Sequence, residues 1–411
     1  MGSRQELPAS PEEAAELLRA CADEGLRLRL RGGGTKLGWG RPAPEPDVEV
    51  VTGHLDRVVE HNAGDLTAVL QAGVPLATAQ ETFAAAGQML ALDPPLRGPG
   101  PAGEAAATVG GVVASGDSGP LRHRYGAARD LLLGITVALS DGTLARAGGK
   151  VIKNVAGYDL AKLYAGSFGT LGLIVEVVVR LHPRPPRTAS VVGRTDDAAA
   201  LGRAAAALAH APAQMDCLDE AWGQGRGELL ARFGGAACED RAASAVALMK
   251  GCGLEAGLVE GDDAEVWERQ RHRQRSVSAS NWPSTAAAGT PGGPLGGGGA
   301  IVRVSGLPAE LANVIRAAER AGGTLVGRAG LGLSWIELPS VAGAEELAGR
   351  IGEVRRELAP RACTVLDAPD EVRDRIDLWG PDPSGLALMR RLKERFDPAG
   401  VCNPGRFVGG I

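Results

Sequence analysis

The 411-residue sequence predicts an α+β protein of at least two domains. Two observations point to this fold class. Short apolar strand patterns alternate with amphipathic helix patterns along most of the chain, and the second half runs twice through the series strand–helix–strand–strand–helix–strand. That order is typical of an antiparallel sheet covered by helices, in a ferredoxin-like arrangement. The 60 glycines and 26 prolines follow no repeating period, so most of the chain is expected to fold.

The first elements lead directly into a glycine-rich loop. Ser10-Pro-Glu-Glu13 is a capping box with proline at the first helical position, and Gly25 is expected to end the helix. The alternating segment 26–30 then predicts a strand, which continues into Arg31-Gly-Gly-Gly-Thr-Lys36.

The remaining elements of the first half follow in order. Strands are expected at 69–73, 131–139 and 173–181, and a helix at 75–86. Asp141-Gly142 is expected to form a two-residue hairpin turn into a strand at 143–146. Asp159 is a candidate cap for a short helix that ends before Gly166, a role we favour over that of a reactive acid.

A proline cluster at 183–186 marks the first domain boundary. After it, strands are expected at 188–193, 215–218, 228–233, 300 onward, 324–327, 331–338 and 363–366, and helices at 198–208, 242–249, 309–320 and 344–358. The uncharged segment 276–299 is interpreted as a flexible loop. We therefore expect domains at 1–183 and 184–394, with 395–411 returning to the first.

Composition excludes several classes of function. The net charge of −5 and the 3% aromatic content give no case for nucleic-acid binding. The six cysteines form no CxxC pair, so neither zinc nor an iron–sulfur cluster is expected. The first residues lack the apolar core of a signal peptide, and no window is apolar enough for a membrane helix. A reduced, cytoplasmic protein is the expectation, with peripheral membrane association only through a complex.

Three glycine-rich segments carry the chemical signal: 31–36, 108–126 and 166–174, the last preceded by Lys153-Asn-Val-Ala-Gly-Tyr-Asp-Leu160. Segment 31–36 is neither a Rossmann fingerprint nor a Walker A motif, and taken alone it could be an ordinary glycine turn. Together, glycines that expose successive backbone N–H groups favour an anion site, so a flat phosphorylated ligand is expected.

These motifs resemble the FAD-binding domain of the vanillyl-alcohol oxidase (PCMH-type) flavoproteins, and above all an FAD-binding subunit of bacterial glycolate oxidase. The resemblance covers 11–183 and 395–411. It implies non-covalent FAD, because Thr35 and Lys36 stand where covalent relatives place a histidine. It also implies these cofactor contacts: Arg31, Gly32, Gly33, Gly34, Thr35, Lys36, Asp93, Thr108, Gly110, Gly111, Ser115, Gly116, Gly119, Arg122, Tyr125, Gly126, Asn154, Tyr158, Gly169, Thr170, Gly172, Ile174, Asn403 and Arg406.

The chain departs from its relatives in three places. Phe168 stands where dehydrogenases have glutamate, and Arg406 stands where lysine is usual. Relatives that oxidise 2-hydroxy acids also use paired histidines in the second domain, whereas only His182, His210 and His272 lie beyond residue 180 here. No catalytic residue and no metal ligand can therefore be named. His123 and the basic run 269–275 are interpreted as solvated, although that run could bind an anion.

Three hypotheses follow. In the first, the chain is an accessory or electron-relaying FAD subunit of a glycolate oxidase complex, acting in glyoxylate metabolism beside a sister flavoprotein and an iron–sulfur subunit. In the second, it is a stand-alone FAD-dependent 2-hydroxy-acid oxidoreductase. In the third, it is a non-catalytic scaffold that keeps only the flavoprotein fold. The missing histidines argue against the second, and the intact glycine motifs argue against the third.

Overall fold

A computed structural model describes residues 3–96, 106–150, 159–275, 299–341 and 343–411. The chain forms two compact units: Met1–Ser118 with Gly126–Arg184 and Pro381–Ile411, and Gly119–Tyr125 with Pro185–Gly380. The first unit thus gathers both ends of the chain. The predicted return of the C-terminus begins earlier than residue 395, because the helix that precedes the final motif packs with the first unit as well.

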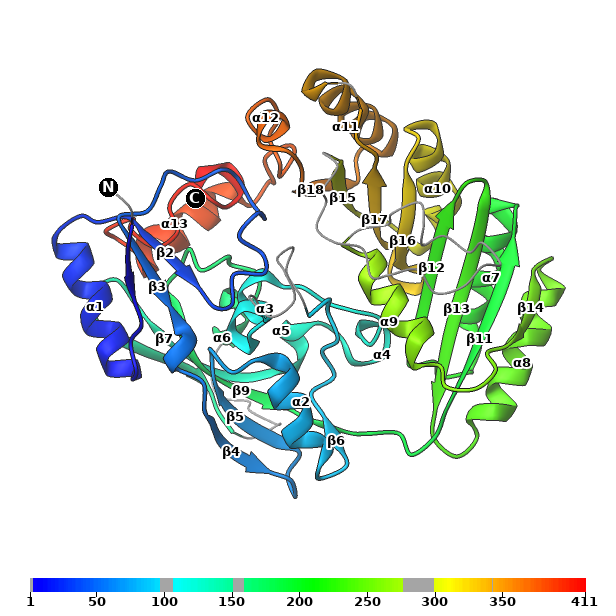
Figure 1. Cartoon of the computed structure of the whole chain (residues 1–411), viewed down its shortest axis with the longest axis horizontal. Coiled ribbons are helices and arrows are strands. Elements are labelled where there is room, and N and C mark those ends of the chain that lie inside the picture. The colour runs from blue at the N-terminus through cyan, green and yellow to red at the C-terminus, as the bar shows by residue number, and fades with distance from the viewer. Residues whose placement is uncertain (1–2, 97–105, 151–158, 276–298, 342) are drawn as a thin grey trace. The chain divides into compact units, whose positions relative to one another are not determined.

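The first unit contains two main sheets (Figure 1). The smaller is parallel, in the order β1-β3-β2. The larger is antiparallel, in the order β4-β5-β9-β7-β8. The strands are β1 (Arg4–Glu6), β2 (Leu28–Arg31), β3 (Val48–Val51), β4 (Val58–Asn62), β5 (Thr67–Gln71), β7 (Leu132–Ala138), β8 (Leu144–Gly148) and β9 (Leu173–Arg180), with a small pair of β6 (Gln88–Met89) and β10 (His182–Pro183).

Short helices connect these strands: α1 (Pro11–Asp23), α2 (Leu76–Ala84), α3 (Val109–Ser115), α5 (Ala128–Leu131), α6 (Ala161–Tyr164) and α13 (Leu386–Phe396). Helix α1 begins as predicted, with the Ser10 hydroxyl accepting from the Glu13 N–H, and it ends before Gly25 at φ +67°. The apolar face of α1 lies in one core with residues of β2, β3, β7 and β9 and with Cys402, so the C-terminal segment contributes to this core.

Two local predictions are wrong. Asp159 does not cap α6, whose N-cap is Leu160, and its carboxylate lies 3.5 Å from the Lys162 ammonium instead. The turn between β7 and β8 is longer than two residues, because the Leu139 N–H bonds the Thr143 carbonyl and leaves residues 140–142 between them.

The second unit confirms the predicted double series. One antiparallel sheet has the order β14-β11-β13-β12-β16-β17-β15-β18, in which each half is one strand–helix–strand–strand–helix–strand unit. Its strands are β11 (Thr188–Thr195), β12 (Cys217–Gly223), β13 (Arg226–Gly234), β14 (Glu255–Leu258), β15 (Ala300–Ser305), β16 (Thr324–Arg328), β17 (Leu333–Leu338) and β18 (Ala362–Asp367). The halves join where β12 pairs with β16.

Helices cover the sheet (Figure 1): α7 (Ala198–His210), α8 (Cys238–Gly251), α9 (Ala264–Arg273), α10 (Leu311–Arg320) and α11 (Ala344–Leu358), with short α4 (Arg122–Tyr125) and α12 (Asp370–Arg373). The main core lies between the sheet and α7, α8, α10 and α11. Trp267 of α9 packs separately on Cys217 and Leu230. Among the described residues, every helix is too short or too polar to cross a lipid bilayer. The predicted loop 276–299 lies outside the described residues except at Gly299.

Candidate functional site

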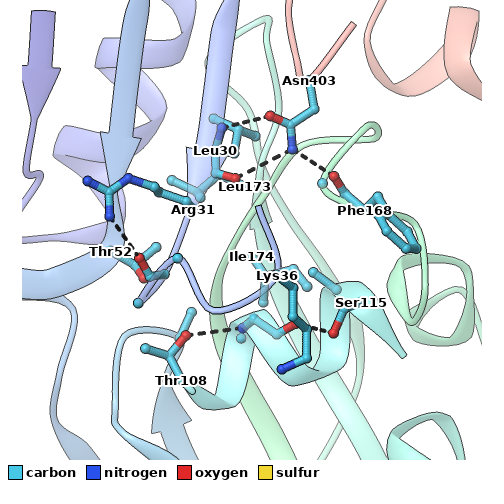
Figure 2. Close-up of a pocket in the computed structure, with 18 of the residues that line it drawn as sticks. Leu30, Arg31, Lys36, Thr52, Thr108, Ser115, Phe168, Leu173, Ile174 and Asn403 are labelled. Carbon is cyan, nitrogen blue, oxygen red and sulfur yellow. Dashed lines mark hydrogen bonds between the residues drawn. The ribbon is translucent and has the colours of Figure 1, made fainter. Parts of the chain in front are cut away.

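A pocket in the first unit encloses about 760 Å³ of empty space, part of it open to solvent. Figure 2 shows its wall, which comes from the loop after β2, from α3, from the chain leading into β9 and from the C-terminal segment. The glycine segments therefore meet in space although they are far apart in sequence.

Most of the candidate residues line this pocket: Arg31, Gly32, Gly33, Gly34, Thr35, Lys36, Thr108, Gly110, Gly111, Ser115, Gly169, Gly172, Ile174, Asn403 and Arg406. Others in the first unit do not line it: Asp93, Gly116, Gly126 and Thr170. Gly119, Arg122 and Tyr125 belong to the second unit. Asn154 and Tyr158 lie outside the described residues. The sequence reasoning missed these lining residues: Leu30, Leu37, Thr52, Ala72, Ala114, Phe168 and Leu173.

The loop after β2 presents backbone donors. The N–H groups of Gly32, Gly33 and Gly34 donate no hydrogen bond to any described residue. Glycine is needed here because a Cβ on Gly33 would lie 1.8 Å from the Ala106 carbonyl oxygen, and one on Gly32 would lie 2.1 Å from the Thr108 hydroxyl. Successive N–H groups without a protein partner form an anion site. This loop therefore fits the diphosphate of a dinucleotide.

Helix α3 forms the opposite part of the wall and was not predicted as a helix. Its N-cap hydroxyl, from Thr108, accepts from the Gly111 N–H at 3.2 Å. A Cβ on Gly110 would lie 2.5 Å from that of Ala72, so this glycine lets α3 pack closely on the end of β5. Gly116 ends the helix at φ +65°. The sequence did not predict this helix, because two adjacent glycines lie near its start and glycine is a poor helix former.

The C-terminal segment completes the pocket through Asn403. The Asn403 side-chain oxygen accepts from the Leu30 N–H at 2.8 Å, and its amide nitrogen donates to the Phe168 carbonyl at 2.6 Å. Nearby, the Lys393 ammonium donates to the Thr170 carbonyl at 2.8 Å. The segment thus holds the end of β2 and the loop before β9 together.

The three cationic side chains at the pocket all bond to protein oxygen atoms. Arg31 pairs with Glu49 at 3.2 Å, Lys36 pairs with Asp117 at 3.2 Å, and the Arg406 guanidinium donates to the Lys36 carbonyl at 3.2 Å. The charges of Arg31 and Lys36 are therefore largely compensated within the first unit, and the Arg406 guanidinium is held by a backbone carbonyl. The backbone donors of the glycine loop remain the groups that most directly fit an anion.

Thr52 follows β3 directly and belongs to none of the glycine motifs. Its side chain lines the pocket, and its hydroxyl oxygen is buried with no hydrogen-bond partner in the described part of the chain. A buried polar atom without a partner is unusual in a native protein. A ligand in the pocket would supply a partner, which is a second observation that fits a nucleotide.

Two predictions for the second unit are wrong. His123 is half-buried rather than solvated, and burial lowers the pKa of its imidazole. The basic run 269–275 is also partly buried: Gln270 donates to Asp219 at 3.2 Å, and Arg273 lies 3.4 Å from Glu228. These side chains hold α9 on the sheet, a packing role that charge alone did not reveal.

Comparison with known proteins identifies the cofactor. Residues 6–148 match the family model described as "FAD binding domain", and 380–407 match "FAD linked oxidases, C-terminal domain". The structure is similar to p-cresol methylhydroxylase, with a TM-score of 0.69 at 15% identity over 98% of this chain and 88% of that one. The chain therefore contains an FAD-binding domain, and its fold is that of the PCMH-type (vanillyl-alcohol oxidase) flavoproteins.

Sequence relatives indicate which kind of FAD-binding protein this chain resembles. The chain is 27% identical to an uncharacterised FAD-linked oxidoreductase of Mycobacterium tuberculosis, over 98% of this chain and 90% of the relative. It is 37% identical to glycolate oxidase subunit GlcE of Escherichia coli over 164 residues, which cover 40% of this chain and 45% of the relative. It is thus an FAD-linked oxidoreductase of the glycolate oxidase and D-lactate dehydrogenase family.

Proposed function

We propose that this chain is the FAD-binding subunit of a complex that oxidises glycolate to glyoxylate. In that complex it relays electrons or positions its partners, and a sister flavoprotein and an iron–sulfur subunit complete the assembly. Bound FAD supplies a two-electron acceptor. The single observation that carries the proposal is the complete glycine-lined pocket in a chain with only three histidines beyond residue 180.

The residues proposed to act on the cofactor have different roles. Gly32, Gly33 and Gly34 are proposed to bind the diphosphate through their N–H groups, because these donors have no partner among the described residues. Asn403 holds the pocket wall, and the hydroxyl of Thr52 is proposed to bind the nucleotide directly. The flavin is proposed to be non-covalent, as expected from Thr35 and Lys36.

The placement of the histidines supports an accessory role. The three lie on different elements: His182 on β10 of the first unit, and His210 at the end of α7 and His272 on α9 of the second. The His210 ring contacts the Ala206 carbonyl within its own helix, at 2.7 Å. General-base catalysis typically contributes about 10²–10⁴-fold, so a chain without such a base should oxidise glycolate slowly.

A stand-alone oxidoreductase is the second candidate function. The match to the FAD-linked oxidoreductase of M. tuberculosis favours it, because that match extends through both units rather than over the FAD-binding part alone. In this case the base would be a residue other than histidine.

Anaerobic reduction of the flavin by glycolate distinguishes the accessory subunit from the stand-alone oxidoreductase. The isolated chain, loaded with FAD, is mixed with excess glycolate, and flavin absorbance is followed with and without the complex purified from the native host. The accessory role predicts slow or no bleaching alone and rapid bleaching with the complex. Rapid bleaching of the isolated chain, unaffected by a chelator, would establish the stand-alone enzyme instead.

A further inference from the structure

The buried ion pair between Lys36 and Asp117 joins two glycine segments of the pocket. The Lys36 ammonium lies 3.2 Å from one Asp117 carboxylate oxygen and 3.3 Å from the Thr35 hydroxyl. The other carboxylate oxygen accepts from the Ser118 N–H at 2.9 Å. Only 8% of the lysine side chain and 1% of the aspartate side chain are exposed. Water therefore screens this pair little.

The two partners come from different segments: Lys36 lines the pocket, whereas Asp117 lies beyond the end of α3 and is not a lining residue. Lys36 ends the loop that follows β2, and Asp117 comes directly after Gly116, the residue that ends α3. The C-terminal end of a helix carries partial negative charge, so an aspartate there is unfavourable without a cation. Lys36 supplies a cation. The contact also ties the loop that presents the backbone N–H groups to the helix across from it.

A buried carboxylate that loses its cation is strongly destabilising, whereas removal of both charges is often neutral. An uncompensated negative charge beside Lys36, which lines the pocket, would also disfavour an anionic ligand there. We propose that Lys36 and Asp117 form a neutral latch, a buried ion pair that ties the glycine loop to the end of α3, and that Lys36 serves the cofactor by neutralising Asp117 rather than by binding phosphate. This inference rests on the proposed binding of FAD in the pocket.

The test compares FAD affinity in Lys36→Met, Asp117→Asn and the double variant, by quenching of flavin fluorescence on titration of the apo-protein. The neutral latch predicts at least a tenfold loss of affinity in Lys36→Met. It predicts affinity within threefold of wild type in the double variant, so that Asp117→Asn improves binding when residue 36 is methionine. Lys36→Arg, which keeps the charge, should bind FAD nearly as wild type does.

Two results would overturn the latch. A double variant as weak as Lys36→Met would show that Lys36 binds the ligand itself, and equal affinity in all variants would show that the pair does not act on the site. If Lys36→Met fails to fold, the latch requires that the double variant folds and binds FAD within threefold of wild type, and a double variant that also fails to fold or that binds more weakly overturns it. Lys150→Met, which breaks an exposed pair with Glu60 in the same unit, is the matched control. The wild-type titration reports separately on the proposed function.

Discussion

Asn403 and Phe168 meet beside the pocket, where the amide nitrogen of Asn403 lies 2.6 Å from the carbonyl oxygen of Phe168. Both are non-glycine residues with positive φ, +42° and +57°. Such backbone persists only where the surrounding contacts determine it strongly. Phe168 also packs on Phe407, with ring centroids 5.7 Å apart. The C-terminal segment therefore holds this loop through both a hydrogen bond and an aromatic contact.

Asn403→Ala should weaken the first unit. The variant leaves the Leu30 N–H and the Phe168 carbonyl without their partner, and unsatisfied buried groups cost about 1–3 kcal/mol each. We expect a lower urea midpoint for the apo-protein and weaker FAD binding. Asn313→Ala, which removes an exposed amide that accepts from Arg316, should change neither quantity. An unchanged midpoint for Asn403→Ala would refute this role.

Thr52→Val should separate binding from stability. Valine has the same shape but lacks the hydroxyl, whose oxygen has no partner in the described part of the chain. The apo-protein should be as stable as wild type or more so. FAD affinity should fall about tenfold, as expected from the loss of one hydrogen bond of about 1.4 kcal/mol. Calorimetry and FAD titration measure the two effects, and an unchanged affinity would remove Thr52 from the site.

Gly111→Val should abolish FAD binding. Gly111 lines the pocket. A Cβ at this position would already lie 3.0 Å from the Thr108 hydroxyl oxygen, so we expect the larger valine side chain to extend into the pocket. Gly257→Val on β14 is the control, because a Cβ there meets nothing within 4 Å. Wild-type FAD occupancy in Gly111→Val would mean that the cofactor lies elsewhere.

Glu220 should make the second unit less stable as pH rises. This carboxyl is fully buried, and its hydroxyl partner is Ser334 at 3.1 Å. Burial, together with the neighbouring Asp219, raises the pKa of Glu220 to about 8 from 4.5. The unfolded chain therefore releases a proton that the folded chain keeps, so wild-type stability falls between about pH 4.5 and 8, by at most about 1.4 kcal/mol per pH unit.

Glu220→Gln tests this pH dependence, because the glutamine side chain does not ionise. Its stability relative to wild type should rise steadily from pH 5 to pH 8, as measured by denaturant unfolding with tryptophan fluorescence, since Trp222 lies on the same strand. Glu345→Gln, at an exposed position at the start of α11, should follow the wild-type curve. Parallel curves for wild type and Glu220→Gln would show that Glu220 ionises freely in the folded protein.

Sequence patterns predicted the second unit well, because its order of strands and helices follows from apolar periodicity alone. The same patterns did not predict the features that depend on contacts between segments distant in sequence. The helix at 109–115 contains two glycines and forms because Gly110 packs against Ala72. Thr52 and Phe168 belong to no glycine motif, so only the fold places them at the pocket. The buried pairing of Arg273 with Glu228 likewise depends on strand β13, which is distant in sequence.

The most direct test of the account is the flavin content of the purified chain. The protein is saturated with FAD, desalted and denatured with acid, and the flavin is measured in the supernatant and in the protein pellet. The account predicts one FAD per chain, all of it in the supernatant, with none retained by Gly111→Val. A wild-type chain that takes up no FAD, or that keeps flavin in the pellet, would contradict a non-covalent FAD site built on the glycine segments.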